Sequence, residues 1–186
     1  MNILSLFCRS NAFQEQLEAI RPKLYRVAYS WSHNAALADD LVQETLVKAI
    51  RNAAQLREPE LFNGWVFSIL ANCWRDHFRQ YREMDDIDEI EDFQCVHEIT
   101  PEDSHAQSQL VMRVRNAVAQ LPLGQRQVLT LVDLEELSYI EVAAILEIPM
   151  GTVMSRLCRA RVALKALLNE LAPQQPAQVT RIRRVK

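Results

Sequence analysis

The 186-residue sequence contains only three glycines, and its β-branched residues seldom alternate with polar ones. Half-buried strands need that alternation, and phosphate-binding loops are rich in glycine. No apolar run approaches the ~18 residues that span a bilayer. The segment Met1–Cys8 is too short for a secretory signal and lacks its positive charge. These absences favour an all-helical protein without a membrane span, and we expect it in the cytoplasm.

Paired cysteines and metal-ligand clusters are also missing. The four cysteines have no CxxC spacing: Cys8, Cys73, Cys95 and Cys158. This usage predicts free thiols in a reducing compartment. Cys73 and His77 are four residues apart, but a zinc site needs about four ligands. A second loose group comprises Cys95, His97 and His105. We therefore predict no metal and no other cofactor.

A catalytic constellation is not visible in the sequence either. No nucleophile stands near a candidate base in a recognised motif. We therefore expect neither an enzyme nor a small-molecule substrate.

Basic residues are absent from one long stretch of the chain. From Glu83 to Met112 there are 10 of the 24 acidic residues and none of the 21 basic ones. The rest of the chain thus carries an excess of seven positive charges, although the whole has a net charge of −3. Two basic bodies joined by an acidic segment suit a nucleic-acid-binding protein.

Towards its C-terminal end the sequence has the pattern of two helices joined by a tight turn. Ser138 and Glu141 form a capping box that starts the first helix. Pro149 disfavours a helical conformation for itself and for the residue before it, so Glu147–Met150 is predicted to be a turn. The second helix then opens at Gly151.

The second helix has two different faces at about 100° per residue. Its inward face is apolar and comprises Val153, Leu157, Ala160 and Leu164. Its outward face comprises Ser155, Cys158 and Arg159, with Met154 and Arg161 at the edge. The pair therefore indicates a helix-turn-helix, whose second helix enters the DNA major groove and meets base edges. The alternative is an ordinary antiparallel helix pair.

The first part of the chain predicts four helices. Two of them, Phe13–Ile20 and Pro22–Trp31, have apolar faces, and a proline is acceptable in a first turn. Asn34 is expected to cap a helix over Ala35–Ala54. The fourth helix begins at Leu61.

One side of the helix over residues 35–54 is mainly charged. It comprises Asp40, Gln43, Glu44, Val47, Lys48 and Arg51. A solvated face is the simple interpretation. A docking surface is the alternative, because Val47 is apolar among charges.

The helix that begins at Leu61 changes character along its length. Its first half is apolar nearly all round, which implies burial. Its second half interleaves arginines with aromatic residues: Asn72, Trp74, Arg75, Phe78, Arg79, Tyr81 and Arg82. Such a surface suits single-stranded nucleic acid, because bases stack on aromatic rings while cations follow the phosphates. Trp74 and Phe78 could equally be core aromatics with a charged rim.

Three segments, in this order, resemble those of bacterial RNA polymerase sigma factors. Asp39–Thr45 (DDLVQET) is similar to the segment that grips the clamp helices of the polymerase. Phe62–Arg79 looks like the element that captures the melted −10 strand, and Pro149–Arg161 (PMGTVMSRLCRAR) resembles the −35-binding helix-turn-helix. The short length and the single acidic linker resemble the extracytoplasmic-function (ECF, group IV) subfamily of the sigma-70 family.

The resemblance implies an all-α fold of two small helical domains joined by an acidic flexible linker. It places region 2 at residues 11–82, the linker at 83–103, region 4 at 104–171 and a flexible basic tail at 172–186. Two further helices, Ser104–Gln120 and Gln125–Leu134, are predicted to complete region 4. The linker is either a solubilising segment or a strap through the RNA-exit path of the polymerase.

The resemblance also implies roles for single residues. Core polymerase would be bound by Asp40, Gln43, Glu44 and Val47. The −10 strand would be held by Trp65, Asn72, Trp74, Arg75, Arg79 and Arg82. The −35 element would be met by Thr152, Met154, Ser155, Arg156, Cys158, Arg159 and Arg161.

Two departures from the family pattern bear on −35 recognition. Met154 stands where a Lys or Arg is usual, which removes one contact to DNA. Glu147 stands where a turn glycine is common, at a cost of about 1 kcal/mol if its backbone is left-handed.

The sequence thus predicts a sigma factor that binds core RNA polymerase, directs initiation at promoter DNA and assists strand opening. The subfamily implies control by an anti-sigma factor, which, if membrane-bound, would hold the protein near the inner membrane without insertion of its own. Two alternatives stay open. One is a stand-alone helix-turn-helix regulator that binds duplex DNA as a dimer, and the other is a protein-interaction adaptor with a vestigial DNA motif.

Overall fold

The computed structural model describes the backbone of residues 3–56, 58–84 and 107–170, and side chains over 12–56, 58–79 and 111–169. All regular structure in these ranges is helical, as predicted. The first body contains α1 (Ile3–Ser32), α2 (Ala35–Arg51) and α3 (Phe62–Met84), with 3-10 turns η1 (Ala53–Gln55) and η2 (Pro59–Leu61). The second contains α4 (Gln107–Ala119), α5 (Leu123–Leu129), the π-helical η3 (Thr130–Leu134), α6 (Tyr139–Leu146) and α7 (Met150–Glu170).

The first helix continues through Pro22, so the predicted break at this proline is wrong. A proline inside a helix loses one backbone hydrogen bond and crowds the preceding turn. The apolar face explains the continuity, because Leu17 and Ile20 before the proline and Leu24 and Val27 after it are all buried. Burial of a large apolar side chain contributes about 1.5–3 kcal/mol, so four of them outweigh the cost of the proline.

The junction between α1 and α2 is short and capped on both sides. His33 has a left-handed backbone (φ 50°), and its amide donates to the carbonyl oxygen of Tyr29 at 2.7 Å, which ends α1. The side chain of Asn34 accepts from the amide of Leu37 at 3.1 Å, so the predicted cap of α2 is confirmed. At its other end α2 stops at Arg51, short of the predicted Ala54, and η1 follows.

The helix-turn-helix forms as the capping chemistry predicts. Ser138 and Glu141 make both hydrogen bonds of the capping box at the start of α6. Glu147 ends α6 with left-handed angles (φ 55°, ψ 44°), so the predicted strain at this position is present. The helix predicted over Gln125–Leu134 begins earlier, at Leu123, and widens into a π-helix from Thr130 onwards.

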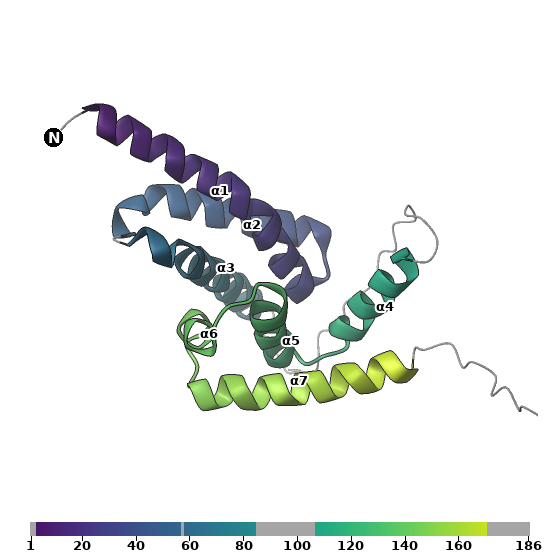
Figure 1. Ribbon diagram of the computed structural model, residues 1–186. Helices are drawn as coiled ribbons and strands as arrows, with labels where there is room; N and C mark the ends of the chain where they lie inside the picture. Colours follow the sequence, from purple (N-terminus) through teal and green to yellow (C-terminus); the bar gives the residue numbers. More distant parts are fainter. Residues whose placement is uncertain (1–2, 57, 85–106, 171–186) are drawn as a thin grey trace, which may run out of the picture.

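The two bodies pack against each other, with α5 between α1 and α7 (Figure 1). The indole Nε1 of Trp31, near the end of α1, donates to Oγ1 of Thr130 at 2.8 Å, and both residues are buried. Nη1 of Arg126 donates to the carbonyl oxygen of Trp31 at 3.2 Å. A cation is favourable there because the last carbonyls of a helix carry partial negative charge.

An ion pair and apolar packing extend this contact. Nη2 of Arg26 lies 3.0 Å from Oε1 of Glu135, whose side chain is only 1% exposed. Burial raises the pKa of Glu135, and the hydrogen bond from Arg26 opposes that rise. The buried apolar residues of both bodies form one continuous cluster. The sequence predicted two separate bodies, so their shared core is a finding of the tertiary structure.

Neither a membrane span nor a metal site is found in the described ranges. Every helix in them is too short or too polar to cross a bilayer. Groups of three or more His, Cys, Asp or Glu side chains placed to hold a metal ion are not found in them. The predicted linker and tail lie largely outside these ranges, as do Cys95, His97 and His105.

Replacing Thr130 with valine should lower the free energy of unfolding by about 1–3 kcal/mol, because the indole N–H of Trp31 would stay buried without its acceptor. Urea unfolding followed by circular dichroism measures the change. In a Trp31→Phe background the same substitution should cost much less. An equal cost in both backgrounds would contradict the importance of this hydrogen bond.

Candidate nucleic-acid interface

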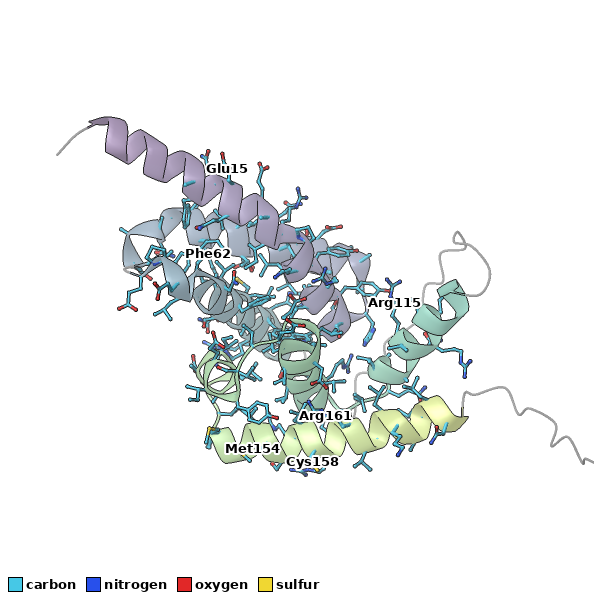
Figure 2. All side chains as sticks on the ribbon, in the orientation of Figure 1. Glu15, Phe62, Arg115, Met154, Cys158 and Arg161 are labelled. Atoms are coloured by element: carbon cyan, nitrogen blue, oxygen red, sulfur yellow. The ribbon has the colours of Figure 1, made fainter. Side chains whose placement is uncertain are left out.

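The outward face of α7 is solvent-exposed, as its periodicity predicts. Ser155, Cys158 and Arg159 are exposed, whereas Val153 and Leu157 are buried against α5 and α6. Figure 2 shows Met154 and Cys158 on the side of α7 that points away from α5. A helix presented in this way can enter a DNA groove without rearrangement of its own core.

The arginines of α7 divide into two groups. Arg161 forms a two-point contact with the carboxylate of Asp133, with Nε 3.1 Å from Oδ2. This hydrogen bonding raises the pKa of Arg161 and ties α7 to η3. Arg156 is half-buried and lies over Gly124, where an added Cβ would come within 2.9 Å of its Nη1. These two side chains therefore support the helix.

Arg159 is differently placed. It is exposed, and its Nε donates to the backbone oxygen of Ser155 in the previous turn at 3.2 Å. Oγ of Ser155 donates in turn to the backbone oxygen of Thr152, which is half-buried, at 3.1 Å. Contacts within one exposed helix are weak, so Arg159 can extend towards a base or phosphate at little cost.

Four of the residues predicted to hold the −10 strand fall on one side of α3. At 3.6 residues per turn, Trp65, Asn72, Arg75 and Arg79 share a face. Asn72 and Arg79 are exposed, and Trp65 and Arg75 are half-buried. The side chain of Arg82 lies outside the described residues.

Trp74 is on the opposite side of α3 and is 3% exposed. Its ring contacts Trp31 at a centroid distance of 5.8 Å and Phe78 at 4.5 Å. Of the two interpretations of Trp74, this placement matches the core aromatic. In this conformation Trp74 supports α3 and offers no face to a base.

Arg75 is occupied by two partners. Its Nη2 donates to Oδ1 of Asn72 and, at 2.9 Å, to Oε1 of Glu147 in the turn of the helix-turn-helix. Its Nη1 lies 2.7 Å from Oε2 of Glu147. The α3 face and the turn before α7 are therefore joined by a bidentate ion pair.

The predicted docking face on α2 is open to solvent. Asp40, Gln43, Glu44 and Val47 are all exposed, and Val47 retains 45% of its accessible surface. Nζ of Lys48 lies 2.8 Å from Oε1 of Glu44 and 3.5 Å from Oδ2 of Asp76 on α3.

The contact with Glu44 raises the pKa of Lys48. The contact with Glu44 lies within α2, whereas the longer contact with Asp76 links α2 to α3.

Comparison with known proteins identifies the two bodies. The family model for sigma-70 region 2 matches residues 17–83, and the model for sigma-70 region 4 matches residues 112–164. The ECF RNA polymerase sigma factor EcfG of Rhodopseudomonas palustris is 35% identical over 161 residues, which cover 86% of this chain and 86% of that relative. The chain belongs to the ECF sigma factors.

Other relatives and solved structures agree. The ECF sigma factor SigW of Bacillus subtilis is 29% identical over 170 residues, which cover 87% of this sigma factor and 91% of SigW. The sigma factor RpoE of Bartonella quintana, solved with the anti-sigma factor NepR, matches with a TM-score of 0.65 and 28% identity. The match covers 85% of this chain and 97% of the RpoE chain. CnrH, solved with the cytosolic domain of CnrY, has a TM-score of 0.61 at 26% identity. These findings favour the sigma factor over the stand-alone regulator and the adaptor.

The residues that connect region 2 of this sigma factor to region 4 were not predicted from the sequence. For Glu147 the sequence predicted only backbone strain, and for Thr130 and Glu135 it predicted no contact with region 2. Their partners are far away in the chain: 72 residues separate Arg75 from Glu147. A single sequence holds no local pattern for such pairs, although the missing turn glycine marked the position of Glu147.

The two described cysteines of this sigma factor should differ sharply in reactivity. Cys158 is exposed, whereas Cys73 is buried, and burial raises the pKa of its thiol while a hydrogen bond from Thr45 opposes the rise. The thiolate is the reactive form, so at pH 8 iodoacetamide should modify Cys158 at least about tenfold faster than Cys73. Peptide mass spectrometry measures both rates. The difference should vanish in urea, and equal rates in the folded protein would contradict the burial of Cys73.

Proposed function

We propose that this sigma factor binds core RNA polymerase through the exposed face of α2 and brings it to promoters by contacts with both promoter elements. The observation that carries the proposal is the orientation of the three matching segments. Each presents its polar residues to solvent from a helix whose other face is buried. In the proposal the docking residues are Asp40, Gln43, Glu44 and Val47.

The −10 strand would be held by the exposed side of α3. Arg75 and Arg79 would follow its phosphates, and Asn72 and Trp65 would meet its bases. Arg82 belongs to the same proposal because it continues the basic run of α3. Trp74 would act from beneath, by holding α3 against α1.

The −35 element would be read by the outward face of α7. Ser155, Cys158 and Arg159 would meet base edges in the major groove, while Met154 at the edge of this face offers an apolar contact. Thr152, Arg156 and Arg161 would position the helix. This assignment follows from the exposure of the first group and the internal contacts of Arg156 and Arg161.

The proposal also covers the domain bounds of the chain, its lack of a catalytic role and its location. Region 2 would span residues 11–82, the acidic linker 83–103, region 4 residues 104–171 and the tail 172–186. The chain itself would have no catalytic role, because RNA synthesis belongs to the polymerase. We place the protein in the cytoplasm, where core polymerase is.

An anti-sigma factor is the proposed regulator. RpoE was solved with the anti-sigma factor NepR and CnrH with the cytosolic domain of CnrY, and the two matches cover 85% and 87% of this chain. Both matches span region 2 and region 4, which supports the same mode of control. If the inhibitor is membrane-bound, it would hold the sigma factor near the inner membrane.

Replacing Gln43, Glu44 and Val47 together with alanine should weaken binding to core polymerase at least about tenfold, equal to about 1.4 kcal/mol. The reason is that the variant removes one apolar and two polar contacts from the docking face. Fluorescence anisotropy of the labelled sigma factor titrated with core enzyme measures the affinity. A matched control replaces exposed Gln14, Glu15 and Glu18 on α1 and should bind as the wild type does. Equal weakening by both variants would refute the docking face.

Arg159→Ala should reduce discrimination at one base pair of the −35 element by about 1–3 kcal/mol. A promoter would first be selected from genomic fragments by the holoenzyme, and open-complex formation would then be compared on single-base variants of it. Lys165→Ala, an exposed change one to two turns further along α7, should weaken all sites alike or not at all. Unchanged discrimination with Arg159→Ala would remove Arg159 from the reading face.

A further inference from the structure

The bidentate contact between Arg75 and Glu147 occupies the guanidinium proposed to hold the −10 strand. Both terminal nitrogens of Arg75 face the two carboxylate oxygens of Glu147, at 2.7 and 2.9 Å. Carboxylate and phosphate present the same geometry to a guanidinium, namely two oxygens for two parallel N–H donors. Glu147 thus stands where a phosphate of the melted strand would otherwise bind.

Glu147 ends α6 in a left-handed backbone conformation (φ 55°, ψ 44°). A left-handed conformation is unfavourable for a residue with a side chain, and glycine would relieve it. The turn nevertheless carries a glutamate, and its carboxylate is directed across the boundary between α6 and α3, which pack together. The contact with Arg75 is thus made from a position whose backbone conformation favours glycine.

Further contacts between regions 2 and 4 lie away from the residues proposed to face DNA. Trp31 and Thr130 form a buried hydrogen bond between α1 and the end of α5. Arg26 on α1 pairs with the nearly fully buried carboxylate of Glu135. Because these groups do not contact Arg75, a change at Arg26 can loosen the boundary without altering Arg75 itself.

We propose that this contact between regions 2 and 4 is an intramolecular latch in which Glu147 mimics a DNA phosphate and keeps Arg75 from the −10 strand until the regions separate. The latch leaves the outward face of α7 exposed, so region 4 stays available while region 2 is blocked. Only open molecules of the free chain then bind single-stranded DNA through Arg75. The apparent affinity is therefore the affinity of the open state multiplied by the fraction of molecules that are open. This inference rests on the proposed role of Arg75.

Two variants test the latch with opposite changes of charge. Glu147→Gln removes a negative charge at the pair itself. Arg26→Ala removes a positive charge on α1 and leaves Glu135 buried without its partner, which disfavours the closed state. Each has a control on α1 with the same change of charge at an exposed residue: Glu15→Gln for the first and Arg21→Ala for the second. Figure 2 shows Glu15 on α1 well away from region 4.

Two measurements are made on each full-length free protein. Hydrogen exchange of peptides from α5 and α6 reports closure. Anisotropy of a fluorescein-labelled single-stranded DNA oligonucleotide reports DNA affinity. Circular dichroism verifies that the helical content of each variant equals that of the wild type.

Both latch variants should exchange faster in α5 and α6 and bind the oligonucleotide more tightly. A partly exposed bidentate pair shifts the equilibrium modestly, so Glu147→Gln should tighten binding about fivefold, equal to about 1 kcal/mol. Arg26→Ala should also tighten binding although it removes a positive charge, whereas Arg21→Ala should leave it equal or weaker. A simple electrostatic effect predicts the opposite sign for Arg26→Ala.

Three results would overturn the inference, each in a different way. Unchanged exchange in both latch variants would show that the regions are not held by these contacts, and it would leave the proposed function untouched. Faster exchange with DNA affinities equal to those of the controls would refute the role of Arg75 in strand binding. Tighter binding by Glu147→Gln but not by Arg26→Ala would mean that Glu147 merely repels DNA.

Discussion

The buried end of α1 determines how the rest of this sigma factor is arranged. Trp31 brings a large apolar ring and an N–H group into a region without water, where an unpaired donor is costly. The hydroxyl of Thr130 accepts from that N–H, and Arg126 donates to the carbonyl oxygen of the same residue. Thr130 and Arg126 both belong to the α5–η3 segment. One residue of region 2 therefore fixes the helix on which region 4 is built.

The α5–η3 segment in turn positions the recognition helix α7. α5 packs on α7, and Arg161 ties α7 to η3 through Asp133. Arg156 lies flat over Gly124, where the lack of a side chain leaves room for the guanidinium. Because the apolar residues on the inward face hold α7 in place, the exposed residues on its outward face are not needed for packing. The contacts of the α7 arginines thus distinguish their roles: Arg156 and Arg161 support the helix, whereas Arg159 remains available to DNA.

The closed arrangement gives the two regions unequal access to DNA. The outward face of α7 remains exposed, while Arg75 on α3 is held by Glu147 from the helix-turn-helix. A protein that must act only within a holoenzyme gains from such an asymmetry, because free molecules would not capture single strands. An inhibitor that binds both regions would stabilise the same arrangement by mass action. Internal closure and external inhibition would then act on one equilibrium.

Several features of this protein were determined by its sequence alone. Helix faces, the capping box at Ser138 and the family resemblance all depend on residues within a few positions of each other, which is the range over which helical periodicity and capping operate. Only the tertiary structure decided that α1 continues through Pro22, that Trp74 is a core residue and that Glu147 pairs with Arg75. Periodicity tells which side of a helix is buried, but not what covers it. The residues that cover it lie far along the chain. They come together when the apolar surfaces of the two regions are buried against each other and the N–H group of Trp31 finds its acceptor.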